Sequence, residues 1–252
     1  MFYRKFNFSA AVLVLALLST VTGFAKSVTT TSFANTNGET RTEVSNQRVL
    51  HRINLAILIQ DDLTSQVSNE LRATADFIRS LPKGSRVMVG YITAGSLQVR
   101  QPFTADLERA ARSLRIVRSS TSASPFNPYV EVVEALRSFD NVSGQNAVLL
   151  ISDGLDTSRG FDIASSARTL DLDRAIKHAN SRNVAVYTFY APSVGLTGRN
   201  RIAASYGQNS LNRLADETGG RAFFQGSTGF VTFDSYFRSL TRTLNEQNSR
   251  TS

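Results

Sequence analysis

The chain has 252 residues, of which 41% are hydrophobic, which is enough to bury one core in a domain of about 200 residues. It contains no cysteine, which excludes disulfides, zinc–thiolate sites and cysteine nucleophiles. The formal net charge is +8. The arginines, Arg115 and Arg118 among them, are spread thinly without interleaved aromatic residues. We interpret them as a solvated basic surface and expect no nucleic-acid partner.

The first 25 residues have the pattern of a secretory signal peptide. Arg4 and Lys5 precede a wholly apolar run from Ala10 to Leu18, and small residues precede a cleavage point after Ala25. The run is shorter than the roughly 20 residues of a membrane-spanning helix. Cleavage predicts a secreted or periplasmic protein with no membrane span and a charge of +6, from 26 basic and 20 acidic residues. An uncleaved anchor that extends through Val21 is the alternative.

Residues 26–47 are rich in Ser, Thr and Asn and contain few large apolar side chains. Such a segment cannot bury enough surface to offset its ordering entropy, so we predict a flexible polar linker. The folded domain is expected to span residues 48–247, and a disordered tail is expected at residues 248–252.

Strand and helix patterns alternate from Arg52 onward. Apolar runs bounded by turn residues predict strands at Asn54–Ile59, Arg86–Thr93, Leu97–Phe103, Ala147–Ile151, Val184–Phe189 and Arg221–Phe224. Apolar residues at helical spacing predict helices at Val67–Leu81, Ala105–Leu114, Tyr129–Phe139, Leu172–Ala179, Leu211–Ala215 and Phe233–Leu244. The stretch Val194–Gln208 is predicted to be a long loop.

This order of elements predicts an α/β fold: a doubly wound, mostly parallel six-stranded sheet with helices on both faces, Rossmann-like in outline. In such sheets ligands bind beyond the carboxyl ends of the strands, where the strand order reverses. The loops that follow Ile59 and Ile151 are therefore the candidate site.

Both of these loops carry acids. One reads QDDLTS from Gln60 to Ser65, the other reads SDGLDT from Ser152 to Thr157, and a hydroxyl-rich stretch runs from Ser119 to Ser124. Carboxylate and hydroxyl oxygens suit a hard cation such as Mg²⁺, and clustered carboxylates without a basic neighbour favour one. The alternative is structural: Asp61 and Asp62 cap the following helix, and Asp153 begins an ordinary turn.

Three stretches resemble a von Willebrand factor A-type (VWA) domain, nearest to the divergent VWFA-related group of acidobacterial secreted proteins. They are AVLLISDGLDT (Ala147–Thr157), VRQPFTAD (Val99–Asp106) and GQNSLNRLADETGGRAF (Gly207–Phe223), within a likeness that covers about residues 50–247. The resemblance implies a VWA fold and a non-catalytic module. Such a module binds a protein or envelope component outside the cytoplasm through the loops at the carboxyl rim of the sheet.

The family's metal-ion-dependent adhesion site (MIDAS) takes Asp-x-Ser-x-Ser from the first loop, Thr from the second and Asp from the third, and a partner's carboxylate completes it. Asp153 matches this pattern directly. The first Asp falls on Gln60 under strict alignment and on Asp61 if the loop is one residue longer, and no register supplies every ligand. The resemblance implies a degenerate site that holds Mg²⁺ weakly or holds no metal, with the candidate ligands Asp61, Asp62, Ser65, Ser124 and Asp153.

Other residues of these loops are candidates for direct contact with a partner. They form a partner-binding rim of Thr64, Phe126, Asp156, Arg199 and Arg201. Core packing is the alternative role for the aromatic residue, and plain solvent exposure is the alternative for the arginines.

An exported hydrolase or other enzyme on an α/β scaffold is the alternative to a binding module. It would place His51 or His178 in hydrogen bonds to a serine and a carboxylate. The sequence has neither a Gly-x-Ser-x-Gly elbow nor a glycine-rich nucleotide loop. We therefore predict that the protein is not an enzyme.

Overall fold

The computed structural model describes residues 30–34, 40–44, 52–119, 127–139, 144–158, 160, 170–224 and 232–250. The chain divides into two units, Met1–Asn46 with Thr251–Ser252, and Gln47–Arg250. In the first unit β1 (Thr30–Ala34) pairs with β2 (Thr40–Val44) in antiparallel register. The prediction of a linker without regular structure is wrong for these ten residues, whose threonines favour strands.

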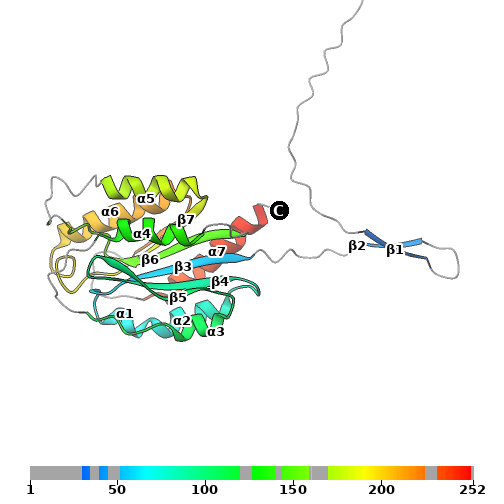
Figure 1. Cartoon of the computed structure of the whole chain (residues 1–252), viewed down its shortest axis with the longest axis horizontal. Coiled ribbons are helices and arrows are strands. Elements are labelled where there is room, and N and C mark those ends of the chain that lie inside the picture. The colour runs from blue at the N-terminus through cyan, green and yellow to red at the C-terminus, as the bar shows by residue number, and fades with distance from the viewer. Residues whose placement is uncertain are drawn as a thin grey trace, which may run out of the picture. The chain divides into compact units, whose positions relative to one another are not determined.

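The second unit contains a six-stranded sheet (Figure 1). Its strands are β3 (Ile53–Gln60), β4 (Arg86–Thr93), β5 (Ser96–Thr104), β6 (Gln145–Ser152), β7 (Val184–Tyr190) and β8 (Ala222–Phe223). Their order is β5-β4-β3-β6-β7-β8, and all neighbours are parallel except β4 and β5. The predicted fold class is confirmed. The edge strand β5 is mostly exposed, and its pairing with β4 shifts register twice.

Helices cover both faces of this sheet, as Figure 1 shows. One face carries α1 (Gln66–Asn69), α2 (Leu71–Ser80), α3 (Leu107–Arg112) and α7 (Asp234–Arg250). The other carries α4 (Pro128–Leu136), the short 3₁₀ helix η1 (Arg137–Phe139), α5 (Leu170–Ser181) and α6 (Arg201–Glu217). Among the described helices, none combines the length and apolarity needed to cross a membrane.

The sheet separates two apolar clusters. Along β3, Leu55, Ile57 and Ile59 pack into one cluster, whereas Ala56 and Leu58 pack into the other, as the alternation of side chains along a strand requires. Every residue of β3 is buried. This explains why the strand reads as a continuous apolar run.

Two predicted boundaries are wrong. The predicted loop Val194–Gln208 ends at Asn200, whose side-chain oxygen accepts hydrogen bonds from the N–H groups of Ile202 and Ala203 and so caps α6. At the C-terminus, α7 continues to Arg250, so residues 248–250 of the predicted disordered tail are helical.

The loops after β3 and β6 meet at the switch point of the sheet. These two strands are adjacent, in the register Ile59↔Ile151, although 84 residues (61–144) lie between the end of one and the start of the other. From them the chain proceeds in opposite directions, to β4 on one side and to β7 on the other. The predicted place for a ligand is therefore flanked by Gln60 on one strand and Asp153 after the other.

Helix α6 packs directly against the loop that follows β6. A Cβ atom at Gly207 would lie 1.9 Å from the carbonyl oxygen of Asp153, and one at Gly154 would lie 2.3 Å from the carbonyl oxygen of Gly207. Gly154 also has φ +73°, a conformation that side chains disfavour. These two glycines allow the close approach that fixes the position of Asp153.

We predict that Gly207→Ala lowers the melting temperature (Tm), although alanine normally stabilises a helix by about 1 kcal/mol relative to glycine. The added methyl group must displace the Asp153 loop, at a cost of about 2 kcal/mol, or roughly 4–8 °C in Tm. Gly195→Ala is the matched control, because no atom lies within 4 Å of its added Cβ. Equal Tm values for the two variants would contradict the close approach.

Candidate functional site

Gln60, the last residue of β3, connects the two acidic loops through its side-chain amide. Its Oε1 accepts hydrogen bonds from the Ser152 hydroxyl at 2.6 Å and from the Asp153 N–H at 3.3 Å. Its Nε2 donates to Oδ1 of Asp62 at 2.6 Å and to Oδ1 of Asp153 at 3.2 Å. A neutral amide therefore holds two carboxylates together at the switch point.

Asp153 is buried and accepts further hydrogen bonds. Its Oδ1 accepts from the Leu155 N–H at 3.1 Å, and its Oδ2 accepts from the Thr197 hydroxyl at 3.0 Å. Burial raises the pKa of Asp153 despite these hydrogen bonds. Burial, followed by the charge of Asp153, raises the pKa of Asp62 to about 7. Each carboxylate thus makes the other harder to ionise.

Asp61 has a different environment, because it is paired with arginine. Arg115 forms a two-pronged ion pair with it, from Nη1 to Oδ1 at 2.8 Å and from Nη2 to Oδ2 at 2.9 Å. The Arg118 N–H and the Thr93 hydroxyl donate to the same carboxylate at 2.9 and 3.1 Å. Burial alone would raise the pKa of Asp61, but these donors and the Arg115 charge hold it below its usual range.

The position of Arg115 is itself fixed by Tyr91. The guanidinium carbon lies 4.0 Å from the centroid of the Tyr91 ring, a cation–π contact. The Tyr91 hydroxyl donates to the Arg115 carbonyl at 2.9 Å and accepts from the Arg115 N–H at 2.8 Å. Our expectation that no basic residue neighbours the acidic pair is therefore wrong for Asp61.

The described donors do not fit a magnesium ion. Magnesium requires oxygen ligands in near-octahedral geometry, whereas the N–H₂ group of Gln60 is directed at the carboxylates of Asp62 and Asp153. Both oxygens of Asp61 are engaged by donors, chiefly Arg115. Leu63, in the middle position of the first-loop motif, is fully buried. Within the described ranges, no three His, Cys, Asp or Glu residues cluster in a way that could hold a metal.

The remaining candidate ligands are dispersed. Ser65 is exposed and precedes α1 without a side-chain capping bond, and Ser124 lies outside the described residues. The alternative in which Asp61 and Asp62 cap a helix is also wrong, because Ser65 occupies the capping position and the acids bond elsewhere.

The predicted partner-binding rim is assembled in part. The Thr64 N–H donates to the Pro192 carbonyl at 3.0 Å, so the loops after β3 and β7 lie together. Asp156 is half-buried and accepts from Ser158. Arg199 and Arg201 are exposed. Phe126 lies outside the described residues.

The histidines do not form a catalytic group within the described part of the chain. His178 Nδ1 lies 3.2 Å from Nη1 of Arg182, which directly follows α5, and the Ser181 hydroxyl donates to the His178 carbonyl. His51 lies outside the described residues. The condition stated for a hydrolase is therefore not met at His178.

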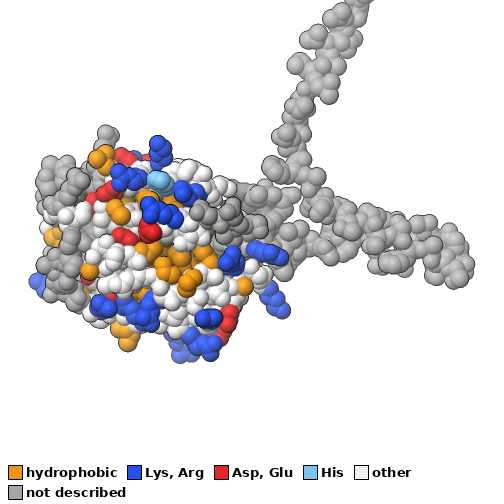
Figure 2. Space-filling model, in the orientation of Figure 1, with side chains coloured by type: hydrophobic (Ala, Val, Ile, Leu, Met, Phe, Trp, Pro, Cys, Tyr) orange, Lys and Arg blue, Asp and Glu red, His pale blue; other side chains and the backbone are white. Residues whose placement is uncertain are grey.

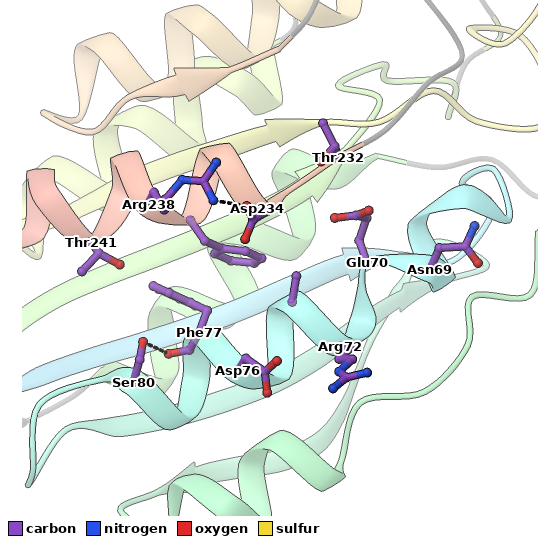
Figure 3. A pocket seen from close by; sticks show the side chains of 12 residues that line it. Asn69, Glu70, Arg72, Asp76, Phe77, Ser80, Thr232, Asp234, Arg238 and Thr241 are labelled. Carbon is purple, nitrogen blue, oxygen red and sulfur yellow. Dashed lines mark hydrogen bonds and ion pairs between the residues drawn. The ribbon is translucent and has the colours of Figure 1, made fainter.

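A groove of about 620 Å³ lies away from the rim, between α2 and α7 (Figure 3). Its apolar floor includes Phe77, which stacks on Phe237 with ring centroids 4.5 Å apart. Arg238 in its wall is paired with Asp234. The groove lies between two helices and not beyond the carboxyl ends of the strands, so it is a weaker candidate site than the rim.

Sequence reasoning missed the side chains that compensate the acids: Thr93, Arg115, Arg118 and Thr197. Arg115 had been interpreted as part of a solvated basic surface. Figure 2 shows basic side chains scattered over one face of the molecule, consistent with that interpretation for most of them. One signal in the sequence could have identified Gln60 as a residue of the site: strict alignment places it at the family's first Asp position.

We predict that Arg115→Met destabilises the protein by about 3 kcal/mol, because it leaves the Asp61 charge buried with poor compensation. The corresponding drop in Tm is roughly 6–12 °C at pH 7. The native pair stabilises the fold above the ordinary carboxyl pKa and loses this effect as pH falls through the lowered pKa of Asp61. The variant should therefore differ less from wild type at pH 3. The double variant Arg115→Met/Asp61→Asn carries no charge at position 61, so its Tm at pH 7 should recover toward that of wild type. If the Tm does not recover, the buried charge of Asp61 is not the cause of the destabilisation.

We predict that Asp62→Asn stabilises the protein at pH 8 more than at pH 5. Because the pKa of Asp62 is raised to about 7, its ionisation destabilises the wild-type fold as pH rises from about 4 to 7. Asparagine keeps an acceptor oxygen for Gln60 and carries no charge. The gain in Tm at pH 8 should exceed that at pH 5 by about 4 °C, and a gain independent of pH would refute the assignment.

The sequence matches no family model and no curated protein. Several solved structures resemble the chain, and three of them are described here. An aerotolerance-related membrane protein from Bacteroides fragilis is 15% identical over 77% of this chain and 99% of its own, with a TM-score of 0.54. The conserved hypothetical protein BatB from Bacteroides thetaiotaomicron is 14% identical over 77% and 98%, with a TM-score of 0.52.

The third structure is the SpRpn10 VWA domain, which is 12% identical over 75% of this chain and 94% of its own, with a TM-score of 0.49. At these identities the likeness concerns the fold alone. The chain shares with the two Bacteroides structures an α/β fold, which here has a six-stranded, mostly parallel sheet flanked by helices.

Proposed function

We propose that this protein is a non-catalytic, exported module that binds another protein through the rim formed by the loops after β3, β6 and β7, without a metal ion. The VWA-like fold supports a binding role. The observation that carries the proposal is the Gln60 amide between Asp62 and Asp153. This amide stabilises paired acids at the place where the family resemblance implies a cation.

The second acid of the first loop supports the same conclusion. A cation bound by Asp61 would compete with the two-pronged ion pair from Arg115 and with the Arg118 N–H. Leu63 offers no ligand at the middle position of the motif, since its side chain is apolar and buried. Weak Mg²⁺ binding is the alternative, and it would require the side chain of Gln60 to turn away.

Export is supported by the sequence pattern of residues 1–25, which lie outside the described part of the chain. The stretch from Ala147 to Thr157 still favours a relation to VWFA-related secreted proteins. A secreted or periplasmic location would place the rim where it meets envelope proteins. An envelope polymer is the alternative partner, and the experiment below separates the two.

Site-specific photo-crosslinking tests the proposal. A benzoylphenylalanine at Ser65, which is exposed on the rim, should yield a covalent adduct with a protein in cells that naturally produce this chain. The matched control is the same residue at Lys83, which is exposed between α2 and β4 at the opposite edge of the sheet. We expect an adduct at position 65 alone, unchanged by a chelator. An adduct only at position 83, or one lost on chelation and restored by magnesium, would refute the proposal.

Thermal unfolding provides an independent measurement of metal dependence. A metal present at a hundred times its dissociation constant would add about 2.7 kcal/mol of stability, or roughly 5–11 °C in Tm. We expect millimolar magnesium, manganese or calcium to change Tm by less than about 1 °C relative to a chelator. A larger shift that Asp153→Ala abolishes would establish a metal site.

A further inference from the structure

The segment Leu114–Ser119, here called the arginine segment, is attached to the first acidic loop by its backbone as well as by Arg115. The N–H groups of Arg118 and Ser119 donate to the Asp61 side chain and carbonyl at 2.9 and 3.1 Å. The Val117 N–H donates to the Ser68 hydroxyl at 3.3 Å. A segment with no helix or strand is therefore anchored at several points beside the rim.

This anchoring leaves one positive charge uncompensated. Asp61 supplies a single carboxylate to two guanidinium groups, those of Arg115 and Arg118. The Arg115 side chain is 21% exposed and fully engaged, whereas the Arg118 side chain is 63% exposed and touches Asp61 only through Nε at 3.4 Å. Among the described residues, Asp61 is the sole ion-pair partner of Arg118. Of the two guanidinium groups, that of Arg118 is therefore the more exposed and the less tightly paired.

An exposed apolar side chain lies between the two arginines. Ile116 is 71% exposed, one of the most exposed large apolar residues in the described chain. Its neighbour Val117 is 3% exposed and packs into the core, which fixes the direction in which Ile116 points. An anchored segment that presents an apolar group beside a cation loses little further entropy on binding.

The rest of the described rim adds to the positive field. Arg199 and Arg201 are exposed on the loop after β7 and at the start of α6. Of the acids here, Asp61 and Asp153 are buried, Asp62 has a raised pKa, and the half-buried Asp156 offsets only part of this positive charge. Charge complementarity therefore favours an anionic partner.

We propose that Arg118 and Ile116 form a docking site for an acidic segment of another protein, in which a carboxylate contacts Arg118 and a neighbouring apolar side chain covers Ile116. This inference rests on the proposed rim function and adds the chemistry of the partner. A polypeptide fits better than an anionic polysaccharide or polyphosphate, because those polymers offer charge but no apolar group for Ile116.

A display library of random twelve-residue peptides, selected on the purified full chain, tests the inference. Selected peptides should combine Asp or Glu with an adjacent large apolar residue. Arg118→Gln and Ile116→Ser should each weaken their binding at least about tenfold. Arg242→Gln is the matched control, because Arg242 is exposed on α7 and its loss removes the same charge from another surface. Its binding should equal that of wild type.

The outcomes that overturn the inference differ from those that overturn the rim function. Three results would refute it. The selected peptides could lack acidic residues, or they could bind Arg118→Gln as tightly as wild type. Inorganic polyphosphate could displace the peptides equally well from wild type and from Ile116→Ser. A selection that yields no binding peptide would refute it as well. If peptides lose binding to Ser65→Trp but keep it to Arg118→Gln, the rim function stands and the acidic docking site does not. The photo-crosslinking experiment decides the rim function separately, and the unchanged Tm of each variant establishes that it is folded.

Discussion

Burial of carboxylates at one edge of the sheet is the constraint on which this end of the molecule depends. Asp61 and Asp153 are 3% and 4% exposed, and a buried charge is costly unless it is paired or hydrogen-bonded. The chain solves this problem in two ways. An arginine pairs with Asp61, and the Gln60 amide joins Asp62 to Asp153. Both solutions use donors from the protein itself.

The same donors determine what the surface presents. Asp61 and Asp153 bond to Arg115 and Gln60 and are buried, whereas the exposed side chains of these loops include Ser65, Arg118 and Ile116. The exposed side chains of the rim are therefore more basic than the acid-rich sequence of its loops suggests.

Much of the fold could be predicted because continuous apolar runs such as that of β3 mark strands covered on both faces. The start of α6 was missed because Gly207 and its polar neighbours hide the helical pattern, and the glycine is explained only by contact with Asp153. Gln60 could be placed by alignment. Its four hydrogen bonds, and the pairing of Asp61 with Arg115 across 54 residues, depend on tertiary contacts that no local pattern reveals.

The edge strand β5 has a consequence for how the protein behaves at high concentration. An unpaired strand edge invites intermolecular sheet extension. Here Pro102 removes one backbone donor, Arg100 places a charge on the exposed strand, and the two register shifts against β4 disturb a straight ladder. At the other end of the sheet, β8 is only two residues long. Both margins of the sheet therefore carry features that disfavour pairing with a strand of another molecule.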